Sequence, residues 1–298
     1  MWALTTAEFA SGPTACLVVG DTLHPLSELA AAHGVALPGT VVDVLADWAR
    51  CEPLLSDLAG RATGGHPVAE AGILAPLRYP GKILCAGANY FDHMAEMGFP
   101  DITKDSQRLF FFMKPPRNAI VGPGATVLMP RGTQAFDWEV ELAAVIGKTA
   151  RHVSVDDALS YIAGYTVAID FSARDFNKAP EQFYKLDWVA GKANDTCCPI
   201  GPCIVPAAHF PNPQAARLRL SVNGELKQNG SAEQMIFSIA EQVARASEIM
   251  TLDPGDLLLT GTPAGVGVPK QSFLKVGDRV DAEIDGIGKL SVTIAGEA

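Results

Sequence analysis

The 298-residue sequence has no long apolar run, and no basic segment leads into one at its N-terminus. A helix that crosses a bilayer needs about 20 mostly apolar residues, so we expect neither a membrane span nor a secretory signal. Basic residues are also scarce, since 23 Lys and Arg against 33 Asp and Glu give a formal charge of −10. This charge disfavours nucleic acid and anionic lipid as partners. An anionic ligand would therefore need a local positive centre, such as a metal ion or a buried lysine.

Paired cysteines are missing as well. The six cysteines form no C-x-x-C pair, and no second Cys/His pair accompanies the group from Cys197 to Cys203. A zinc site at that group stays a minor alternative to buried free thiols. We therefore expect a reducing cytoplasm as the setting. Hydrophobic residues make up 48% and charged residues 19%, which excludes a disordered chain and indicates a folded one.

The first 70 residues differ in pattern from the rest. An apolar run at 15–19 precedes Ala-rich stretches at 27–33 and 41–59 that favour helices, and the Gly-rich segment 60–67 (GRATGGHP) is typical of a linker. We predict a small N-terminal α/β domain over residues 1–70 and a catalytic domain over 71–298.

From residue 73 onward, short β-like runs alternate with Pro/Gly turns. Asn223-Gly224 and Asp285-Gly286 each predict a tight hairpin, and Ser238 followed by Glu241 predicts a capped helix reaching about Met250. The class is therefore α+β and β-rich, with a few covering helices. The predicted strands are 82–86, 109–113, 138–146, 165–170, 218–222, 257–260, 279–284 and 289–294.

The most informative pattern is Asp137-Trp-Glu-Val-Glu-Leu142. Alternation along a strand puts Glu139 and Glu141 on one face, which continues as Ala143 and Val145. Two neighbouring carboxylates repel each other in a strand that enters a core, and a cation between them would remove that repulsion. A strand with one solvated face is the alternative.

A third acid, Asp170, ends the apolar run 165–169, and Ser172 to Asp175 is typical of a helix start. With the two glutamates it would complete an all-oxygen ligand set suited to Mg²⁺ or Mn²⁺, with Ca²⁺ also possible. The same aspartate could instead be an ordinary turn residue.

Three further features could take part in chemistry. His93 and Glu96 lie three apart on an expected short helix, where a carboxylate can fix the imidazole tautomer and make the other nitrogen a better base. Lys192 could supply the positive centre, and the loop 261–267 could present N–H groups and the Thr262 hydroxyl to an anionic oxygen. A surface His–Glu pair and a solvated lysine are the alternatives. The loop matches neither phosphate-binding glycine pattern, so nucleotide binding is not supported.

Taken together, the chain resembles the fumarylacetoacetate hydrolase superfamily. The resemblance rests on ordered blocks that include KILCAGANYFDHMAEMG (82–98), DWEVELAAVIGK (137–148), YIAGYTVAIDFSARD (161–175) and LDPGDLLLTGTPAGVG (252–267). It implies a mixed β-roll or β-sandwich core, a homodimer, and a small anionic 2-oxo or diketo acid as substrate.

The resemblance also implies residue roles. Glu139, Glu141 and Asp170 correspond to the metal ligands, and His93 with Glu96 to the pair that activates water. Lys192 corresponds to the lysine that holds a substrate oxygen. Further implied substrate contacts are Tyr90, Lys114, Asn177, Gly261 and Thr262.

The implied reaction is hydrolysis of a C–C bond in a 1,3-diketo acid such as an acylpyruvate. An isomerase, hydratase or decarboxylase of 2-oxo acids on the same site, or an inactive binding homologue, are the alternatives. The chain departs from the family pattern at Ile169, Asn177 and Ala193-Asn194, and the segment 177–190 is longer than expected. These departures lie where substrate specificity is set, so they leave the substrate open.

Overall fold

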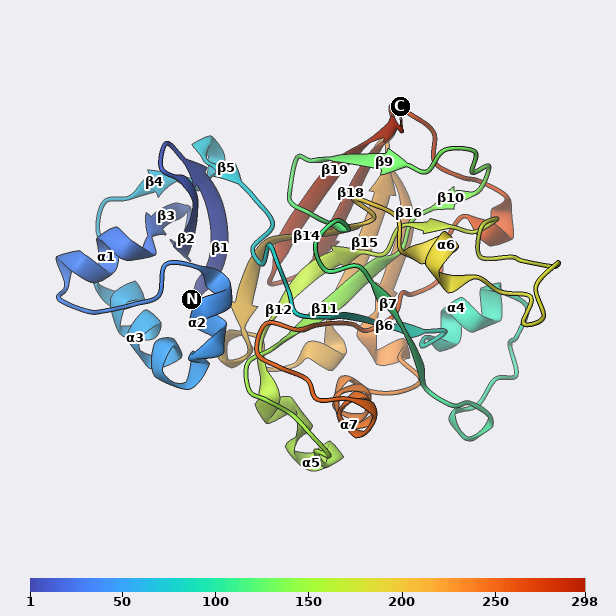
Figure 1. Ribbon diagram of the computed structural model, residues 1–298, viewed down its shortest axis with the longest axis horizontal. Coiled ribbons are helices and arrows are strands. Elements are labelled where there is room, and N and C mark those ends of the chain that lie inside the picture. The colour runs from blue at the N-terminus through green and yellow to red at the C-terminus, as the bar shows by residue number, and fades with distance from the viewer. Residues whose placement is uncertain (298) are drawn as a thin grey trace.

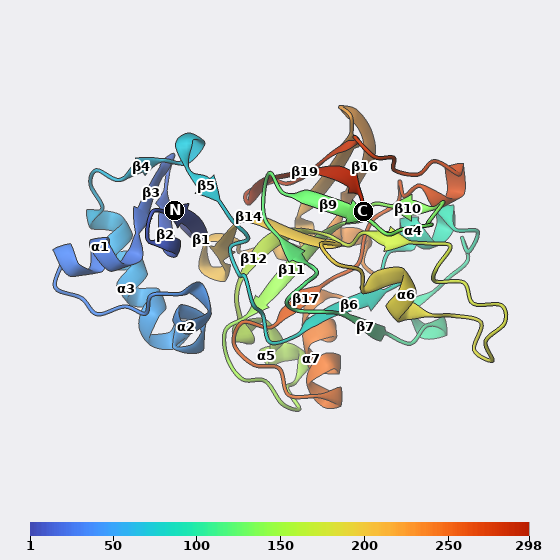
Figure 2. The ribbon, with the colours of Figure 1, turned by 45° about the horizontal axis from the view of Figure 1, so that its top comes forward.

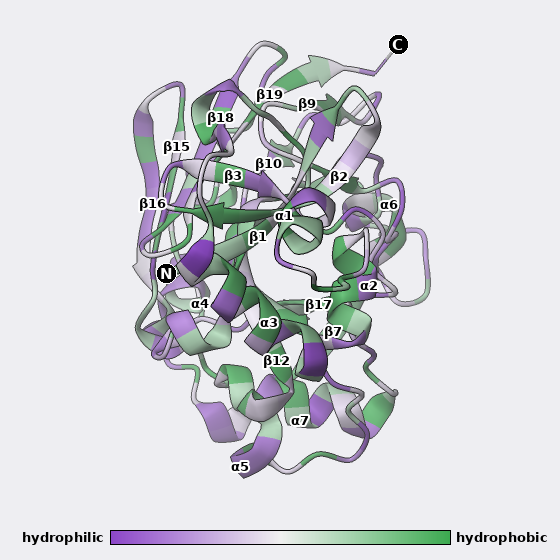
Figure 3. Cartoon of the chain, turned by 90° about the vertical axis from the view of Figure 1, so that its left-hand side faces the viewer, coloured by the Kyte–Doolittle hydropathy of each residue, from purple (hydrophilic) through white to green (hydrophobic). Residues whose placement is uncertain are grey.

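The computed structural model describes residues 1–297. A small N-terminal part, blue to cyan in Figure 1, lies beside a larger β-rich part. Its strands run in the order β4-β3-β2-β1, and β5 pairs with the outer end of β1. Helices α1, α2 and α3 cover one face of this sheet, and α3 turns hydrophilic residues outward in Figure 3. The elements are β1 (Trp2–Phe9), β2 (Gly12–Val19), β3 (Thr22–Pro25), α1 (Leu26–Ala32), α2 (Val41–Ala46), α3 (Trp48–Arg61), β4 (His66–Pro67) and β5 (Gly72–Ile73).

The predicted linker at 60–67 is wrong. Gly60 and Arg61 end α3, and β4 pairs with β3 through Thr22 and Pro67. The glycines that suggested a linker make the turn between that helix and strand. The division at residue 70 stays a prediction, because β5 still pairs with β1 just beyond it.

The N-terminal sheet continues into the larger part, since Leu4 of β1 pairs with Ile204 of β14. From there the order is β14-β12-β11-β17-β6-β7, with β8 beside β14. This run of strands holds the candidate site. Its strands are β6 (Ile83–Gly87), β7 (Phe110–Lys114), β8 (Ile120–Val121), β11 (Val140–Ile146), β12 (Ile162–Ile169), β14 (Cys198–Pro206) and β17 (Leu257–Leu259).

A second sheet, ordered β16-β15-β18-β19-β9, packs against the first, and a two-stranded ribbon joins β10 to β13. The remaining helices cover the ends of the sheets (Figure 2). These elements are β9 (Thr126–Met129), β10 (Phe136–Asp137), β13 (Ser172–Ala173), β15 (Arg217–Val222), β16 (Glu225–Ser231), β18 (Arg279–Ile284), β19 (Gly288–Gly296), α4 (Phe91–Glu96), α5 (Val155–Ala158), α6 (Trp188–Lys192) and α7 (Ile239–Ile249).

Strand β11 has both faces buried. Leu142 and Ala144 join the core between the two sheets, whereas Ala143 and Val145 join the core shared with the N-terminal helices. A strand covered on both sides leaves no solvated face for acidic side chains. The alternative of a half-solvated strand carrying Glu139 and Glu141 is therefore wrong.

Both predicted hairpins and the capped helix are confirmed. Asn223-Gly224 joins β15 to β16 with positive φ at both residues, as a tight hairpin turn requires. Ser238 and Glu241 form the reciprocal capping box that opens α7.

The helix expected to begin at Ser172 is wrong. Ser172 and Ala173 instead form β13, which pairs with β10. The Ser172 hydroxyl donates to the Asp170 carbonyl at 3.0 Å, so it caps no helix. Asp175 accepts from the Thr133 hydroxyl and the Gln134 amide, which holds the turn after β13 in place.

Candidate active site

The antiparallel pairing of β11 with β12 brings three acids together. Val140 pairs with Ile169, so Glu139 and Asp170 lie at the same end of the ribbon, and the Asp170 amide donates to the Glu139 carbonyl at 2.9 Å. Glu141 follows on the same face of β11. One carboxylate oxygen from each acid lies within 4.8 Å of the others, and all three side chains are buried. The predicted convergence of Glu139, Glu141 and Asp170 is confirmed.

Three cations surround these carboxylates. The Lys192 ammonium, at the end of α6, donates to Glu139 and Asp170 at 2.6 Å each. Lys114, at the end of β7, donates to the other Asp170 oxygen at 2.5 Å. Arg174 donates to Glu139 at 2.6 Å and to the buried Asp137 at 2.9 Å.

The two glutamates sit in opposite electrostatic environments. Burial opposes the charged form of Glu139, but Arg174 and Lys192 outweigh it and hold its pKa below the ordinary value. Burial raises the pKa of Glu141 well above the ordinary value, and the charges of Asp170 and Glu139 raise it further. Within residues 1–297, no cation forms an ion pair with Glu141, whose carboxylate accepts from the Gly261 amide at 2.6 Å.

The charge balance of this group fits a divalent cation. With all acids ionised, four carboxylates against three cations leave one negative charge inside the protein, and a divalent ion would turn this into one positive charge. Carboxylate oxygens alone form the ligand set, which suits a hard cation such as Mg²⁺ or Mn²⁺. We call this group the carboxylate–cation cluster; it consists of Asp137, Glu139, Glu141, Asp170, Lys114, Arg174 and Lys192.

His93 and Glu96 form the pair expected from their spacing on α4. His93 Nδ1 lies 2.8 Å from a Glu96 oxygen, and the other Glu96 oxygen accepts from the Gly265 amide at 2.8 Å. This contact fastens α4 to the loop 261–267. Because Nδ1 is engaged, Nε2 is the nitrogen left for chemistry in the adjoining cavity.

A cavity of about 200 Å³ joins these groups. Helices α4 and α6 each contribute side chains to its lining, His93 from α4 and Trp188 and Lys192 from α6. Its polar lining includes the three acids, so they are reached from solvent although buried. The remaining polar side chains that line it are Asn89, His93, Arg174, Lys192 and Thr262, and the apolar ones are Ala86, Ala88, Met94, Met97, Phe99, Phe110, Phe112 and Trp188.

Of the five implied substrate contacts, Thr262 lines this cavity. Its hydroxyl donates to the Val140 carbonyl at 2.9 Å and accepts from Gln228 at 2.8 Å. The other four lie behind the lining, and a substrate contact by them stays a prediction. Gly261 and Lys114 bond the metal-ligand candidates, Tyr90 is fully buried, and Asn177 packs against the Cα of Gly191.

Sequence reasoning missed roles for Arg174, Asp137 and Gln228. Arg174 follows β13 and reaches back to both acids before β11. Gln228 accepts from the Val140 amide and donates to Thr262, so it braces the strand and the loop together. Arg174 and Asp137 both lie within the blocks that carry the family resemblance, which was the available signal.

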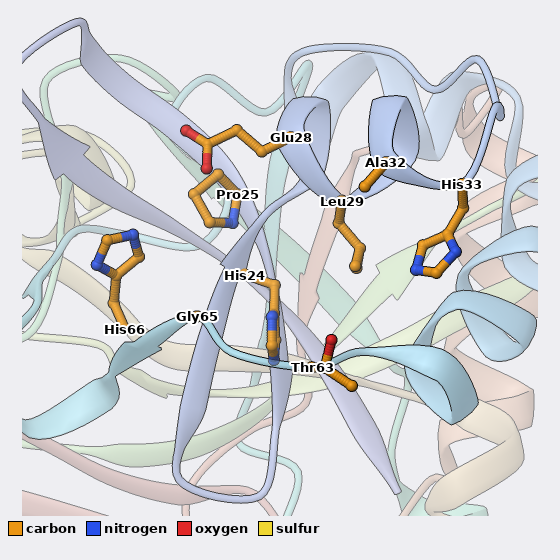
Figure 4. Close-up of a pocket in the computed structure, with 9 residues that line it drawn as sticks. All are labelled: His24, Pro25, Glu28, Leu29, Ala32, His33, Thr63, Gly65 and His66. Carbon is orange, nitrogen blue, oxygen red and sulfur yellow. The ribbon is translucent and has the colours of Figure 1, made fainter.

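A larger hollow of about 360 Å³ lies in the N-terminal part, between α1 and the turn before β4. Its histidines, His24, His33 and His66, come from separate elements and do not converge in Figure 4. Among residues 1–297, the acid triad is the one group of three or more His, Cys, Asp or Glu whose donors converge. The zinc alternative at the cysteine group is therefore not supported.

The fold and the group of acidic side chains are typical of an enzyme with a metal site. Comparison with known proteins gives its family. Residues 82–295 match the family described as fumarylacetoacetate (FAA) hydrolase, C-terminal. The chain belongs to the fumarylacetoacetate hydrolase family, and the predicted fold class is confirmed. No helix within residues 1–297 is long and apolar enough to cross a membrane.

Relatives of several activities resemble this chain. The human mitochondrial oxaloacetate tautomerase FAHD2A is 42% identical over 74% of this chain and 69% of its own length. A putative HpcE protein from Mycobacterium smegmatis is 30% identical over the whole of both chains, with a TM-score of 0.83. Fumarylpyruvate hydrolase from Pseudomonas aeruginosa, solved with Mn²⁺ and pyruvate, is 35% identical over 75% of this chain and 91% of that one, with a TM-score of 0.66.

Proposed function

We propose that this protein hydrolyses the C–C bond between the two carbonyls of an acylpyruvate-type 1,3-diketo acid. The observation that carries the proposal is His93, which is held by Glu96 and lines the same cavity as Glu139, Glu141, Asp170 and the Lys192 ammonium. A base, a positive centre and a set of metal ligands thus converge on one small space. The fumarylpyruvate hydrolase relative, solved with Mn²⁺ and pyruvate, supports this substrate class.

Mg²⁺ or Mn²⁺ held by the three acids would act as a Lewis acid toward the oxygens of the substrate. The substrate carboxylate would be drawn by Lys192 and Arg174, which lie beside Glu139. With a divalent ion bound, the carboxylate–cation cluster would carry one net positive charge, which offsets the −10 background of the chain.

His93 Nε2 would take a proton from a water molecule while Glu96 holds the proton on Nδ1. The hydroxide formed in this way attacks the carbonyl distant from the carboxylate. The C–C bond then breaks, and its electron pair leaves as the enolate of pyruvate, whose charge Lys192 stabilises. The enolate takes up the proton from His93, so water has been added across the bond to give a carboxylic acid and pyruvate.

Tautomerisation of a 2-oxo acid such as oxaloacetate is a second candidate. It is supported by the curated relatives at about 42% identity, which are named oxaloacetate tautomerases. In this reaction His93 would move a proton between carbon and oxygen, and no bond between carbons would break.

The test is a metal-dependent assay on acylpyruvates, fumarylpyruvate and oxaloacetate, which follows loss of the enol chromophore and identifies the products. We expect turnover with Mg²⁺ or Mn²⁺ and none with EDTA. Glu141→Gln should be inactive, and Glu70→Gln, an exposed control, should be unchanged. Cleavage products identify a hydrolase, whereas loss of enol with unchanged mass identifies a tautomerase. An active, metal-free Glu141→Gln protein contradicts both candidates.

The remaining expectations are proposals too. The family resemblance implies a homodimer, and light scattering coupled to gel filtration should give twice the 31.4 kDa of the chain. A mass equal to one chain would contradict it. A cytoplasmic location is proposed from the unpaired cysteines and needs imaging of a tagged protein.

A further inference from the structure

The cavity has two chemically different ends. The carboxylate–cation cluster, His93 and Thr262 form one end. In the described part of the chain, residues 1–297, no charged side chain lines the other end, which is formed by apolar groups from three separate elements. Methionines Met94 and Met97, with Phe99, come from α4 and the turn after it, two aromatic rings come from β7, and Trp188 begins α6.

Three of these side chains form a continuous aromatic wall, defined here as Phe110, Phe112 and Trp188. The Phe112 and Trp188 rings are stacked, with their centroids 5.2 Å apart and an interplanar angle of 13°. Phe110 contacts the same indole at 5.6 Å. Phe110 also lies against the backbone of Gly87, where a Cβ atom would come within 2.1 Å of its ring. The glycine therefore leaves room for the wall to form.

The wall begins directly beside the polar end. Phe110, Phe112 and Lys114 alternate onto one face of β7, and Lys114 bonds Asp170. Trp188 and Lys192 are four residues apart on α6, so they share one face of that helix. The Lys192 ammonium lies 4.9 Å from the Phe112 ring centroid. A molecule held by its carboxylate at Lys192 would therefore extend along the aromatic rings.

Two of the three side chains of the wall are open to solvent, whereas Phe112 is buried. Trp188 is 37% exposed, Phe110 38% and the neighbouring Phe99 58%. Grouped apolar side chains left in contact with water at a cavity mark a surface that a ligand covers. The exposed groups surround the mouth of the cavity that holds the proposed chemistry, which favours the substrate itself as that ligand.

The charged side chains of the cavity determine what kind of substrate group can lie along the aromatic wall. Among residues 1–297, the Lys and Arg side chains that line the cavity are Arg174 and Lys192, and both already bond Glu139 at the polar end. A second carboxylate lying along the wall would lose water without gaining a partner. An alkyl or aryl group would instead cover exposed rings and gain apolar contact.

We propose that the aromatic wall binds an apolar acyl substituent, and that Trp188 is the residue that sets this specificity. The preferred substrate is then a 2-oxo acid with one carboxylate at the polar end and an alkyl or aryl group at the other. This inference rests on the proposed function for the placement of the carboxylate. Substrates with a charged distal end, such as fumarylpyruvate, are used less well.

The test compares kcat/KM of the metal-loaded enzyme for acetylpyruvate, hexanoylpyruvate, benzoylpyruvate and fumarylpyruvate. Wild type should prefer the two apolar acyl groups over acetylpyruvate by about tenfold or more, since a single methylene in an apolar pocket changes kcat/KM by about tenfold or more. Trp188→Ala should lose most of that preference through KM, and Trp188→Phe should keep it. Phe183→Ala is the control, because Phe183 lies in the same segment but is 87% exposed and outside the cavity.

Equilibrium binding gives a readout that needs no turnover. Metal-loaded His93→Gln protein is titrated with hexanoylpyruvate and with pyruvate, alone and combined with Trp188→Ala. The hexanoyl compound should bind more tightly than pyruvate only when the indole is present. If Trp188→Ala does not fold, Phe110→Ala serves the same purpose.

The outcomes separate the two proposals. If wild type turns over no diketo acid but the titration shows the indole-dependent gain, the proposed function is overturned and the wall stands. If all four substrates are cleaved with similar kcat/KM, or fumarylpyruvate is preferred, the inference about the wall is overturned and the hydrolase proposal stands. An equal loss for every substrate in Trp188→Ala also overturns it.

Discussion

Replacement of Glu141 by glutamine should stabilise the metal-free protein while abolishing metal binding. The carboxylate of Glu141 is buried, lies beside two other acids and has no ion-pair partner of its own within residues 1–297. Its pKa is raised well above 4.5 by burial and by those acids. At a pH between its unfolded and its folded pKa, the metal-free folded state therefore holds a proton there that the unfolded state has released. Glutamine keeps the shape and the acceptor for the Gly261 amide without this proton uptake.

The sign and size of this effect on the free energy of unfolding follow from proton linkage. Between the unfolded and the folded pKa of this group, the folded state binds more protons, so the free energy of unfolding falls as pH rises. The slope is about 1.4 kcal/mol per pH unit. An unfolding entropy of about 2.1 cal/mol/K per residue gives about 0.63 kcal/mol/K for 298 residues. The melting temperature of Glu141→Gln should therefore gain about 2 °C on wild type per pH unit as the pH rises from the unfolded pKa toward the folded one.

Thermal melts in EDTA at several pH values measure this difference, with Glu70→Gln as the exposed control. Adding Mn²⁺ should reverse the order of the two melting temperatures, so that wild type melts above Glu141→Gln. At 100 times its Kd the ion stabilises wild type by about 2.7 kcal/mol, or about 4 °C, and it should leave the variant unchanged. Parallel pH profiles in EDTA would refute the raised pKa, and an equal Mn²⁺ shift in both proteins would refute the role of Glu141 as a ligand.

Three other predictions concern separate parts of the molecule. Lys114→Met removes one partner of the buried ion pair with Asp170. It should lower the free energy of unfolding, measured in urea, by about 3–5 kcal/mol, because Asp170 loses a cation. An effect below about 1 kcal/mol would argue against a buried pair. Ser238→Ala should cost about 1 kcal/mol by removing the cap of α7 and leave kcat unchanged, and a changed kcat would show that this helix end reaches the site. Burial raises the pKa of the Cys197 and Cys203 thiols to about 12. At about pH 8 these thiols should therefore react with a disulfide reagent far more slowly in the native protein than in the unfolded protein. Rapid labelling of the native protein would contradict this.

Local sequence patterns predicted those parts of the site that lie within one element. The alternation of Glu139, directly before β11, with Glu141 inside it and the spacing of His93 and Glu96 on α4 each depend on the geometry of a single strand or helix. The position of Asp170 at the end of the apolar run 165–169 suggested that it completes this ligand set, and the family resemblance implied it more specifically. Pairing of β11 with β12 then follows from their order along the chain and their apolar composition.

Other parts of the site depend on register and long-range packing, which no local pattern encodes. Arg174 was expected inside a helix, but a two-residue ribbon with β10 places it beside Asp137 and Glu139. The aromatic wall joins β7 to α6, whose residues are about 75 positions apart in the sequence. Trp188 lies in the segment 177–190, whose unusual length was visible in the sequence. The sequence did not show the direction in which this segment runs.

The carboxylate–cation cluster makes metal and substrate binding depend on each other. In the metal-free state the lysines satisfy Glu139 and Asp170, and the cluster holds at least as much negative as positive charge, so an anionic substrate gains little there. A divalent ion brings the cluster to one net positive charge, which one substrate carboxylate neutralises. The affinity for pyruvate should therefore rise with metal, and by linkage pyruvate should tighten the metal by the same factor. A calorimetric titration that finds equal pyruvate binding with Mn²⁺ and with EDTA would show that the lysines alone recruit the anion.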